Sequence, residues 1–536
     1  MKRSFPIALL FLLTSVAASI VYAAVQQQTQ TAVRLIDGAA EALGGRERIL
    51  AVKAIVLEGY GETAYMNGGG NISASPDAPQ KWVSIPEYEK TIDLEHRRLR
   101  VRQRNHQNFV FASAAGYLGT ADLNTGYLDG QIAYNVNGQN GRGVRGTEAV
   151  ARARRLDMLN NPVAIVRIAL DPSTKLSNLR RQGNVQLVDV VTATDDRLTL
   201  AIDNASRLPS WVSWMERNEN LGDITLRTSY TGYLPFKGVR LPMGYNTTID
   251  FRNITATKIY VDKYAVDDLI DDLAAPPDVR SVPAPVPSPP PVPQVTPVAR
   301  GVWLLHSAGG GGGGANSILF EFADHLTIFE APSSQAWTKA LMERARSTVP
   351  GKPLTEVIVS HHHFDHTGGI RQAIAEGLTV IAHKGTEGLF REIAARKGTI
   401  GPDAIGANPK PLKFLAVDDE KEMKDSTMEV HLYHAISQSH MAEGVFAYVP
   451  RDKLLVQADF FDVGWELYFW QNTYIDNIRH RNLQVDTDVP VHGRVLPLSQ
   501  VLQDIQRMTK AAQELCDRTR AAGAFMPGCP VKTPAR

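Results

Sequence analysis

A proline-rich segment divides the chain and limits what either side of it can fold into. Ten prolines fall within the 22 positions of residues 276–297, PPDVRSVPAPVPSPPPVPQVTP. Proline fixes φ and lacks an amide donor, so such a run favours extended polyproline II over a helix or an interior strand. In a chain of 536 residues this predicts a linker, a semi-rigid spacer between two domains. A docking motif for an aromatic-lined groove is the alternative interpretation.

The first residues, 1–24, have the layout of a secretory signal peptide. Two basic residues precede an apolar stretch, and Val21 and Ala23 fit the small-x-small rule for cleavage. The stretch is short for a membrane span and is interrupted by the polar residues Thr14 and Ser15. We therefore expect a periplasmic or secreted protein with no integral membrane segment after removal of the signal peptide.

The overall composition is that of a soluble globular protein, with 43% apolar and 21% charged residues. The formal net charge is +1, and the sequence pI is about 7.8. A balance this close to neutral gives no reason to expect a nucleic acid or an anionic membrane surface as a partner. A small-molecule substrate is the expected partner instead.

The region before the linker, residues 25–275, is predicted to be rich in β-structure. One helix is expected first, in TAVRLIDGAAEALGG, because apolar residues recur there at helical spacing and a double glycine follows. Alternation of apolar and polar residues then predicts strands in RLTLAIDN, in DITLRTSYTGYL and around residues 255–266. These features favour an antiparallel, strongly curved sheet.

Two stretches of this region resemble the half-barrel domains of lipoprotein carriers. They are ALGGRERILAVKAIVLEGYG near its start and LPFKGVRLPMGYNT near its end. The resemblance rests on layout, with no residue that has a chemical task. It implies an antiparallel β half-barrel that could hold an apolar ligand, while a structural role or docking of a protein partner remains an alternative.

Histidines are distributed unevenly between the two sides of the linker. Of the 14 histidines, only His96 and His106 precede it, and the other 12 follow residue 297. Solvated surface histidines would show no such partition. Any chemistry is therefore expected in a second domain, residues 298–515.

Four of these histidines lie in one short loop, SHHHFDHTGG. The loop follows the apolar, β-branched stretch TEVIVS and precedes a stretch with helical spacing, so it lies where ligand sites of α/β folds occur. In an extended segment His361 and His363 would face one point, and Asp365 and His366 would face a second point beside it. His362 should point away. A solvated polar loop is the alternative that the rest of the chain has to exclude.

Three downstream residues are candidates for completing two metal positions. His440, Asp459 and His492 each come after an apolar, strand-like run, so each could reach the same rim. Together with the loop they make a set of nitrogen and oxygen donors that suits two borderline divalent ions such as zinc.

The segment from His361 to His366 matches the HxHxDH signature of the metallo-β-lactamase superfamily, and His440, Asp459 and His492 follow in the family's order. The resemblance implies an αββα four-layer sandwich and a hydrolase that cleaves an ester, lactone, amide or related bond by means of a hydroxide bridging two ions. It implies the following roles: His361, His363 and His440 hold the first ion; Asp365, His366 and His492 hold the second; Asp459 bridges both; and Asp365 also orients the nucleophile or handles a proton.

Some positions depart from the usual family pattern. The approach to His440 reads AISQSH, and Glu330 stands where many members carry an aspartate, in a position suited to supporting the ligand loops. The presence of Asp459 argues against the zinc β-lactamases proper and favours branches similar to hydroxyacylglutathione hydrolases, lactonases or phosphodiesterases. Two further hypotheses stay open: a mononuclear iron redox enzyme of the same fold, and a non-catalytic protein that carries an apolar ligand in its N-terminal domain.

The two cysteines of the chain, Cys516 and Cys529, lie in or beside the expected C-terminal tail, residues 516–536. In an oxidising compartment they could form a disulfide that ties the tail down. The sequence leaves the pairing open, because it does not give the distance between their Cα atoms.

Overall fold

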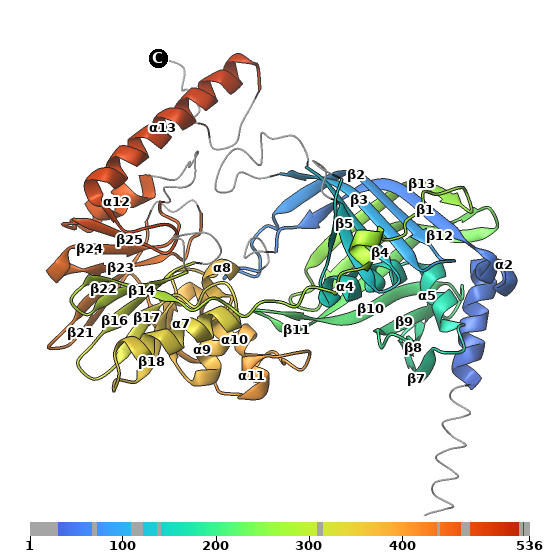
Figure 1. The fold of residues 1–536 in the computed structure, drawn as a ribbon, viewed down its shortest axis with the longest axis horizontal. Coiled ribbons are helices and arrows are strands. Elements are labelled where there is room, and N and C mark those ends of the chain that lie inside the picture. Colours follow the sequence, from blue (N-terminus) through green and yellow to red (C-terminus); the bar gives the residue numbers. More distant parts are fainter. Residues whose placement is uncertain are drawn as a thin grey trace, which may run out of the picture.

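The residues that the structure describes form three β-sheets, with thirteen, seven and six strands (Figure 1). The predicted signal peptide lies outside the residues that the structure describes. Among those residues, no helix is long and apolar enough to cross a membrane. The computed structural model describes residues 30–66, 72–108, 122–136, 141–307, 315–436, 440–461, 472–524 and 529.

The thirteen-stranded sheet forms the N-terminal domain, and every pair of neighbouring strands is antiparallel, as predicted. From edge to edge its strands are β6 (Gly143–Arg145), β5 (Ile132–Val136), β4 (Asp122–Asp129), β3 (Arg98–Gln107), β2 (Trp82–Asp93), β1 (Ala54–Ala64), β13 (Thr255–Val266), β12 (Val239–Ile249), β11 (Gly222–Phe236), β10 (Pro209–Asn218), β9 (Arg197–Asp203), β8 (Val185–Val191) and β7 (Lys175–Gln182).

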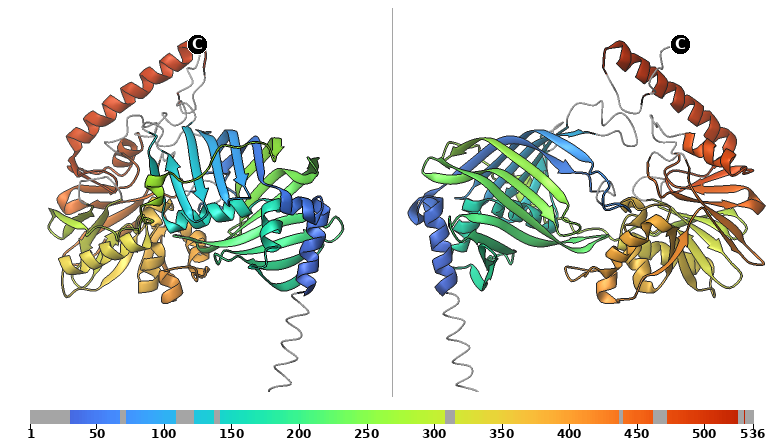
Figure 2. Two further views of the ribbon diagram at one scale, coloured as in Figure 1. Left: turned by 45° about the vertical axis from the view of Figure 1, so that its right-hand side comes forward. Right: turned by 180° about the vertical axis from the view of Figure 1, so that it is seen from behind.

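This sheet is strongly bent, as the views in Figure 2 show. Register shifts interrupt the pairing of the central strand β1 beside Gly59, and the pairing of β2 with β3 between Ser84 and Glu87. Such bulges increase the local twist and bend a strand. Gly59 is also required for close approach, because a Cβ there would lie 1.9 Å from the carbonyl oxygen of Tyr260.

Helices pack on one face of the bent sheet and share its apolar core. The predicted first helix is confirmed over residues 30–43, and the chain leaves it at the double glycine, where Gly44 has a φ of 141°. A short helix, α2 (Arg46–Ala51), follows.

Two further helices of this domain, α4 (Glu148–Leu159) and α5 (Pro162–Ala169), were not predicted. The buried side of α4 is not marked by apolar residues alone, because it includes Arg155, which forms a buried ion pair with Asp196 at 2.8 Å. Helical periodicity is therefore hidden in this stretch of the sequence.

The C-terminal domain contains the other two sheets. In the first, β17 to β20 run parallel to one another and the preceding strands are antiparallel. In order, the strands of the first sheet are β14 (Gln294–Ala299), β15 (Val302–His306), β16 (Ser317–Glu321), β17 (Leu326–Phe329), β18 (Leu354–Ile358), β19 (Thr379–His383) and β20 (Lys413–Val417). Those of the second are β21 (Glu420–Lys424), β22 (Glu429–His434), β23 (Val445–Val449), β24 (Leu454–Gln457), β25 (Thr487–Pro490) and β26 (Leu496–Pro497).

The two sheets of this domain face each other across an apolar core to which both contribute, among others, Phe320 and Val456. Helices α7 (Gln335–Thr348), α9 (Ile370–Glu376) and α10 (Glu387–Ala395) cover the other face of the first sheet. Helices α12 (Asn472–His480) and α13 (Leu498–Ala521) lie outside the second sheet (Figure 1).

The proline-rich segment lacks both helix and strand only in its middle. Its start forms the short helix α6 (Pro277–Arg280), with Val279 buried beside Tyr134, and its end belongs to strand β14. Residues 283–293 between them have no helix or strand. Both ends of the proline-rich segment therefore belong to the domains beside them.

The two domains also contact each other directly. The linker is therefore not a spacer that holds them apart. Leu221 and Phe251 of the N-terminal domain belong to the same apolar cluster as Trp337 and Phe390 of the C-terminal domain. Polar contacts add to this interface, among them an ion pair between Arg252 and Glu392 at 2.8 Å. These residues of the N-terminal domain lie in two turns, the one between β10 and β11 and the one between β12 and β13 (Figure 1).

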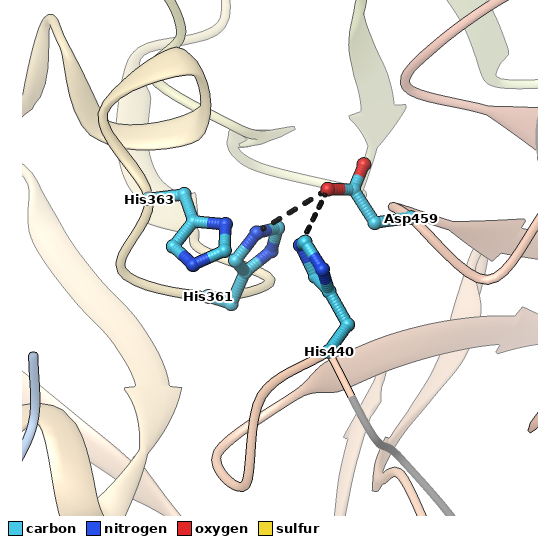
Figure 3. Close-up of side chains that lie close together, drawn as sticks. All are labelled: His361, His363, His440 and Asp459. Carbon is cyan, nitrogen blue, oxygen red and sulfur yellow. Dashed lines mark ion pairs between the residues drawn. The ribbon is translucent and has the colours of Figure 1, made fainter. Parts of the chain in front are cut away.

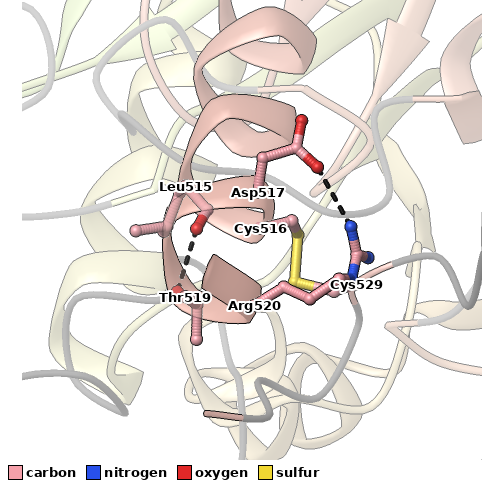
Figure 4. Close-up of a disulfide and its surroundings, with 6 residues drawn as sticks. All are labelled: Leu515, Cys516, Asp517, Thr519, Arg520 and Cys529. Carbon is pink, nitrogen blue, oxygen red and sulfur yellow. Dashed lines mark hydrogen bonds and ion pairs between the residues drawn. A yellow bond between two sulfur atoms is a disulfide. The ribbon is translucent and has the colours of Figure 1, made fainter. Parts of the chain in front are cut away.

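The C-terminal end is cross-linked by a disulfide between Cys516 and Cys529, whose Cα atoms lie 5.6 Å apart (Figure 4). Cys516 lies in α13, and this helix continues to Ala521. The predicted boundary between the second domain and a tail at residue 516 is therefore corrected, since the last helix runs across it.

Candidate metal centre

The histidine loop follows a buried strand and opens a short helix, the position predicted from the sequence. His361–His363 come shortly after β18, and α8 (Phe364–Thr367) begins directly afterwards, carrying Asp365 and His366. Strands β17 to β20 are parallel, so their carboxyl ends lie at one edge of the first sheet. Ligand sites in α/β architectures occur at such an edge.

The other three candidates come from the second sheet. His440 precedes β23, Asp459 follows β24, and His492 follows β25. Because β24 and β25 run parallel, Asp459 and His492 leave the sheet at the same edge. The amide of Val445 donates to the carbonyl of Ser360 at 2.8 Å and thereby joins this edge to the histidine loop.

Four of the predicted ligands form a first group: His361, His363, His440 and Asp459 (Figure 3). One ligand atom of each lies within 4.8 Å of the others, and all four residues are buried. Oδ2 of Asp459 lies 2.9 Å from Nε2 of His440 and 3.6 Å from Nε2 of His361. The ring of His363 lies 4.5 Å from the rings of both other histidines. Three imidazoles and one carboxylate oxygen thus converge.

A second group forms on the other side of the same aspartate: Asp365, His366, His492 and again Asp459. Nε2 of His366 lies 3.4 Å from Oδ2 of Asp365 and 3.3 Å from Oδ1 of Asp459. Nε2 of His492 lies at the same two distances from the same two oxygens. The structure therefore brings all seven sequence-predicted ligands together, with one oxygen of Asp459 directed at each group.

Two residues at this centre have a backbone conformation that side chains other than glycine rarely adopt. Asp459 has a φ of 59° and Glu330 a φ of 84°. Such conformations cost on the order of 1 kcal/mol or more and concentrate at functional sites. In both cases the turn directs a carboxylate into the cluster of histidines.

Polar groups behind the ligands hold two of the imidazoles. Glu330, fully buried, places Oε1 3.5 Å from Nδ1 of His366 and accepts a hydrogen bond from the amide of Ser360 at 3.3 Å. Oγ of Ser360 lies 2.9 Å from Nδ1 of His361. Groups in this position fix the ring orientation and the tautomer of a metal ligand. The supporting role predicted for Glu330 agrees with this geometry.

The two groups differ in electrostatic character. Burial, together with neighbouring imidazoles, lowers the pKa of His361 and of His363 well below the ordinary value, so both are neutral. Burial also acts to lower the pKa of His366 and of His492, but the carboxylates of Asp365 and Asp459 outweigh it and raise both. Without an ion, the second group therefore favours protonated imidazoles.

This arrangement fits divalent metal ions. Neutral imidazoles and carboxylates are the ligand forms that such ions need. Nε2 of His361 and Oδ1 of Asp365 are buried and have no hydrogen-bond partner among the described residues, as expected of atoms reserved for another ligand. At the second group the carboxylates favour positive charge on the imidazoles, and a cation could supply that charge instead.

Other residues near the centre stand outside both groups. His362 belongs to neither, in keeping with the prediction that it points away, but it is buried, with Nδ1 3.9 Å from Oε2 of Glu443. A third, more exposed group combines Glu422, Glu429 and His431 on the outer strands of the second sheet.

Two supporting residues were missed by the sequence analysis, Ser360 and Asn220. Ser360 directly precedes the histidine loop, and the motif spacing could have pointed to it. Asn220 contacts the loop at Thr367 from 147 positions away, in the other domain. No local pattern in the sequence signals such a contact.

Residues 310–460 match the sequence model of the family described as Metallo-beta-lactamase superfamily. This stretch contains six of the seven candidate ligands, all except His492. The family resemblance predicted from the HxHxDH motif is thereby confirmed for the C-terminal domain.

A curated relative and several solved structures are also similar to parts of the chain. A linear primary-alkylsulfatase from Pseudomonas sp is 37% identical over 62 residues, which are 12% of this chain and 9% of that protein. A metallo-beta-lactamase from Pontibacter korlensis is 16% identical, covering 40% of this chain and 99% of its own, with a TM-score of 0.33. The FIM-1 metallo-beta-lactamase from Pseudomonas aeruginosa, in a mono-zinc form, is 15% identical, covering 42% of this chain and 98% of its own, with a TM-score of 0.31.

Proposed function

We propose that the C-terminal domain of this chain, whose residues 310–460 belong to the metallo-β-lactamase superfamily, is a dinuclear zinc hydrolase. Its substrate is a small molecule with an ester, lactone, amide or related bond. The domain has the four-layer αββα sandwich of the family, and His361, His363, His440, Asp365, His366, His492 and the bridging Asp459 are the zinc ligands.

The observation that carries this proposal is the position of Asp459 between two groups of donors. Its Oδ2 faces His440 and His361, whereas its Oδ1 faces His366 and His492. A single carboxylate with one oxygen toward each of two histidine clusters suits a pair of neighbouring ions. A mononuclear iron enzyme would need no such second group.

Two zinc ions would supply an acidic water and an electrophilic partner for the oxygen of the scissile bond. The residues of the chain then have separate tasks. The three imidazoles leave the first position Lewis-acidic, and the carboxylates offset charge at the second. Asp365, whose second oxygen Oδ1 has no hydrogen-bond partner among the described residues, is the group that orients the attacking water or handles its proton.

Elemental analysis of the mature protein, purified without added metal, tests this function. About two zinc ions per chain are expected, together with turnover in a panel of a carboxylic ester, a lactone, an amide and a β-lactam. A primary alkyl sulfate belongs in the panel because of the similarity to the alkylsulfatase. Removing the metal with a chelator should abolish turnover, and returning Zn²⁺ should restore it.

The alternative hypotheses predict different results of the same measurement. One iron per chain would indicate the redox enzyme, and no retained metal even after Zn²⁺ is offered would indicate a binding protein. Either result contradicts the proposed hydrolase.

A periplasmic or secreted location is part of this proposal. The signal-peptide layout of residues 1–24 supports it, and so does the disulfide between Cys516 and Cys529, since such bonds persist in oxidising compartments.

A second proposed function concerns the N-terminal domain, which we propose is a half-barrel that holds an apolar ligand. A cavity of about 200 Å³ lies between the inner face of the sheet and α4. Its apolar lining includes Trp214 and Ile259, while Lys90 and Asp157 form an ion pair at its polar side. An apolar wall with a few polar groups is typical of small-molecule sites.

Binding of a dansylated long-chain fatty acid tests this second function. Thr257→Phe places a bulky side chain in the cavity lining and should abolish binding, whereas Lys258→Phe, one position along β13, directs the same side chain to the opposite face of the strand. Fluorescence titration should separate the two variants. Equal binding by both, or none by the unaltered protein, would exclude the proposed ligand site.

A further inference from the structure

The turn between β10 and β11 reaches from the N-terminal domain to the back of the histidine loop. It consists of Glu219, Asn220 and Leu221. Oδ1 of Asn218 accepts hydrogen bonds from the amides of Asn220 and Leu221, both at 3.0 Å, which closes the turn. Leu221 and Asn220 are fully buried.

The turn is anchored in the C-terminal domain on both sides. The amide of Asp223 donates to the carbonyl of Lys397 at 2.7 Å, and the carboxylate of Asp223 accepts from the amide and hydroxyl of Thr399. On the other side, Nε2 of Gln335 donates to the carbonyl of Glu219 at 2.9 Å. The position of Asn220 is therefore fixed by contacts other than its own.

Nδ2 of Asn220 donates to two atoms of Thr367, the carbonyl oxygen at 2.9 Å and Oγ1 at 2.8 Å. Oγ1 of Thr367 in turn lies 2.9 Å from the carbonyl oxygen of His363, to which it donates. A chain of hydrogen bonds thus runs from the N-terminal domain through the end of α8 to a candidate ligand.

The helix that this chain of hydrogen bonds secures is only one turn long. Helix α8 spans Phe364–Thr367 and carries Asp365 and His366, two of the three residues particular to the second metal position. One helical turn is not stable alone, and its terminal carbonyls need external donors. Asn220 supplies such a donor at Thr367.

We infer that Asn220 is a positioning residue for the metal centre, and that the N-terminal domain thereby completes the second metal position. The inference rests on the proposed function. It assigns a task in the hydrolase to a residue that contacts no substrate or ion. Loss of the Asn220 amide should loosen α8 and with it Asp365 and His366. The first position should be affected less, because His361 and His440 lie outside α8 and the carbonyl of His363 also accepts from the amides of His366 and Thr367.

Zinc affinity of the full-length mature protein tests this inference. The metal is removed with a chelator, and Zn²⁺ is titrated back against a chromophoric chelator that resolves the two positions. Asn220→Ala should weaken the second position about 10- to 100-fold, the range found when a group behind a metal ligand is lost. The first position should change much less.

Thr399→Val is the matched control. It removes a hydroxyl donor to Asp223 in the same interface without touching the histidine loop. Thermal unfolding of both variants shows how far each loosens the interface. Thr367→Val breaks the same chain of hydrogen bonds from the other end, and should reproduce the loss at the second position if Asn220→Ala does not fold.

The outcomes separate the possible roles. Selective loss at the second position in Asn220→Ala and Thr367→Val supports the inference. Unchanged affinities, or equal losses in Thr399→Val, would overturn it and leave Asn220 as an interface residue only. If the unaltered protein binds two zinc ions and cleaves no substrate in the panel, the proposed function fails while the zinc affinities still decide the role of Asn220. If it binds no zinc, both fail.

Discussion

Replacing Asp459 by alanine is expected to abolish hydrolysis and to lower bound zinc well below two ions per chain. This carboxylate directs one oxygen to each group of donors, so its removal takes a ligand from both positions at once. Several kcal/mol of metal-supplied stabilisation of the transition state would be lost, which corresponds to a rate decrease on the order of 10³-fold or more. Elemental analysis and steady-state kinetics measure the two effects.

Two further variants serve as comparisons for Asp459→Ala. His361→Ala removes a ligand from the first group only, and should leave more zinc bound than Asp459→Ala. His431→Ala alters the third group of histidine and glutamates, which is more exposed and already ion-paired, with Nε2 of His431 2.8 Å from Oε1 of Glu429. This control should retain full zinc content and activity. A zinc content of two in Asp459→Ala would contradict the bridging role.

The second large effect is expected from Arg371, which forms a fully buried, bidentate ion pair with Asp403 at 2.7 and 2.8 Å. Its guanidinium also donates to the carbonyl of Ile393 at 2.7 Å. Arg371→Met would leave the Asp403 carboxylate buried without its charged partner, which typically costs about 3–5 kcal/mol of folding free energy. Chemical denaturation of the metal-free protein measures this loss.

The same ion pair predicts a pH dependence of stability. Burial acts to raise the pKa of Asp403, but the hydrogen bonds from Arg371, Gly406 and Gln335 outweigh it and hold the pKa below its ordinary value of 3.8. A carboxyl group of this kind contributes its full stabilisation above the ordinary pKa and loses it as the pH falls through the lower pKa of the folded state. Acid should therefore destabilise the unaltered protein more than Arg371→Met.

An exposed ion pair of the same domain provides the control. Arg391 pairs with Glu387 on α10, with 60% and 38% of the two side chains exposed. Arg391→Met should change the stability by less than about 1 kcal/mol, because solvent screens such pairs. The double variant Arg371→Met/Asp403→Asn should be more stable than Arg371→Met alone, since it removes the buried charge. Equal losses of folding free energy for Arg371→Met and Arg391→Met would show that burial of the ion pair does not increase its contribution to stability.

The candidate metal ligands could be predicted from the sequence because their spacing follows from local geometry. The residues of the HxHxDH motif follow a buried strand directly, so their side chains are near one another in any such loop. His440, Asp459 and His492 lie beside strand ends that the apolar runs already marked. The thirteen-stranded sheet could be predicted in part for a similar reason, since alternating apolar and polar residues mark strands such as β13.

Other features of the protein were decided by the tertiary structure alone. Arg155, on the buried side of α4, interrupts the apolar pattern from which that helix could have been predicted. Its burial depends on its partner Asp196, which is 41 positions away. The packing of the two domains and the contact of Asn220 with Thr367 depend on surfaces formed by segments far apart in the sequence.

By itself, the sequence determined the family of residues 310–460, and it predicted the two-domain division and the candidate metal ligands, since each of these depends on neighbouring residues or on a recurring pattern. Only the tertiary structure decided that Asp459 directs one oxygen at each group and that Asn220 of the N-terminal domain contacts Thr367 beside the histidine loop. The physical reason is that hydrogen bonds and ion pairs depend on distance in space. Contacts between segments that are far apart in the sequence produce no periodic pattern in it.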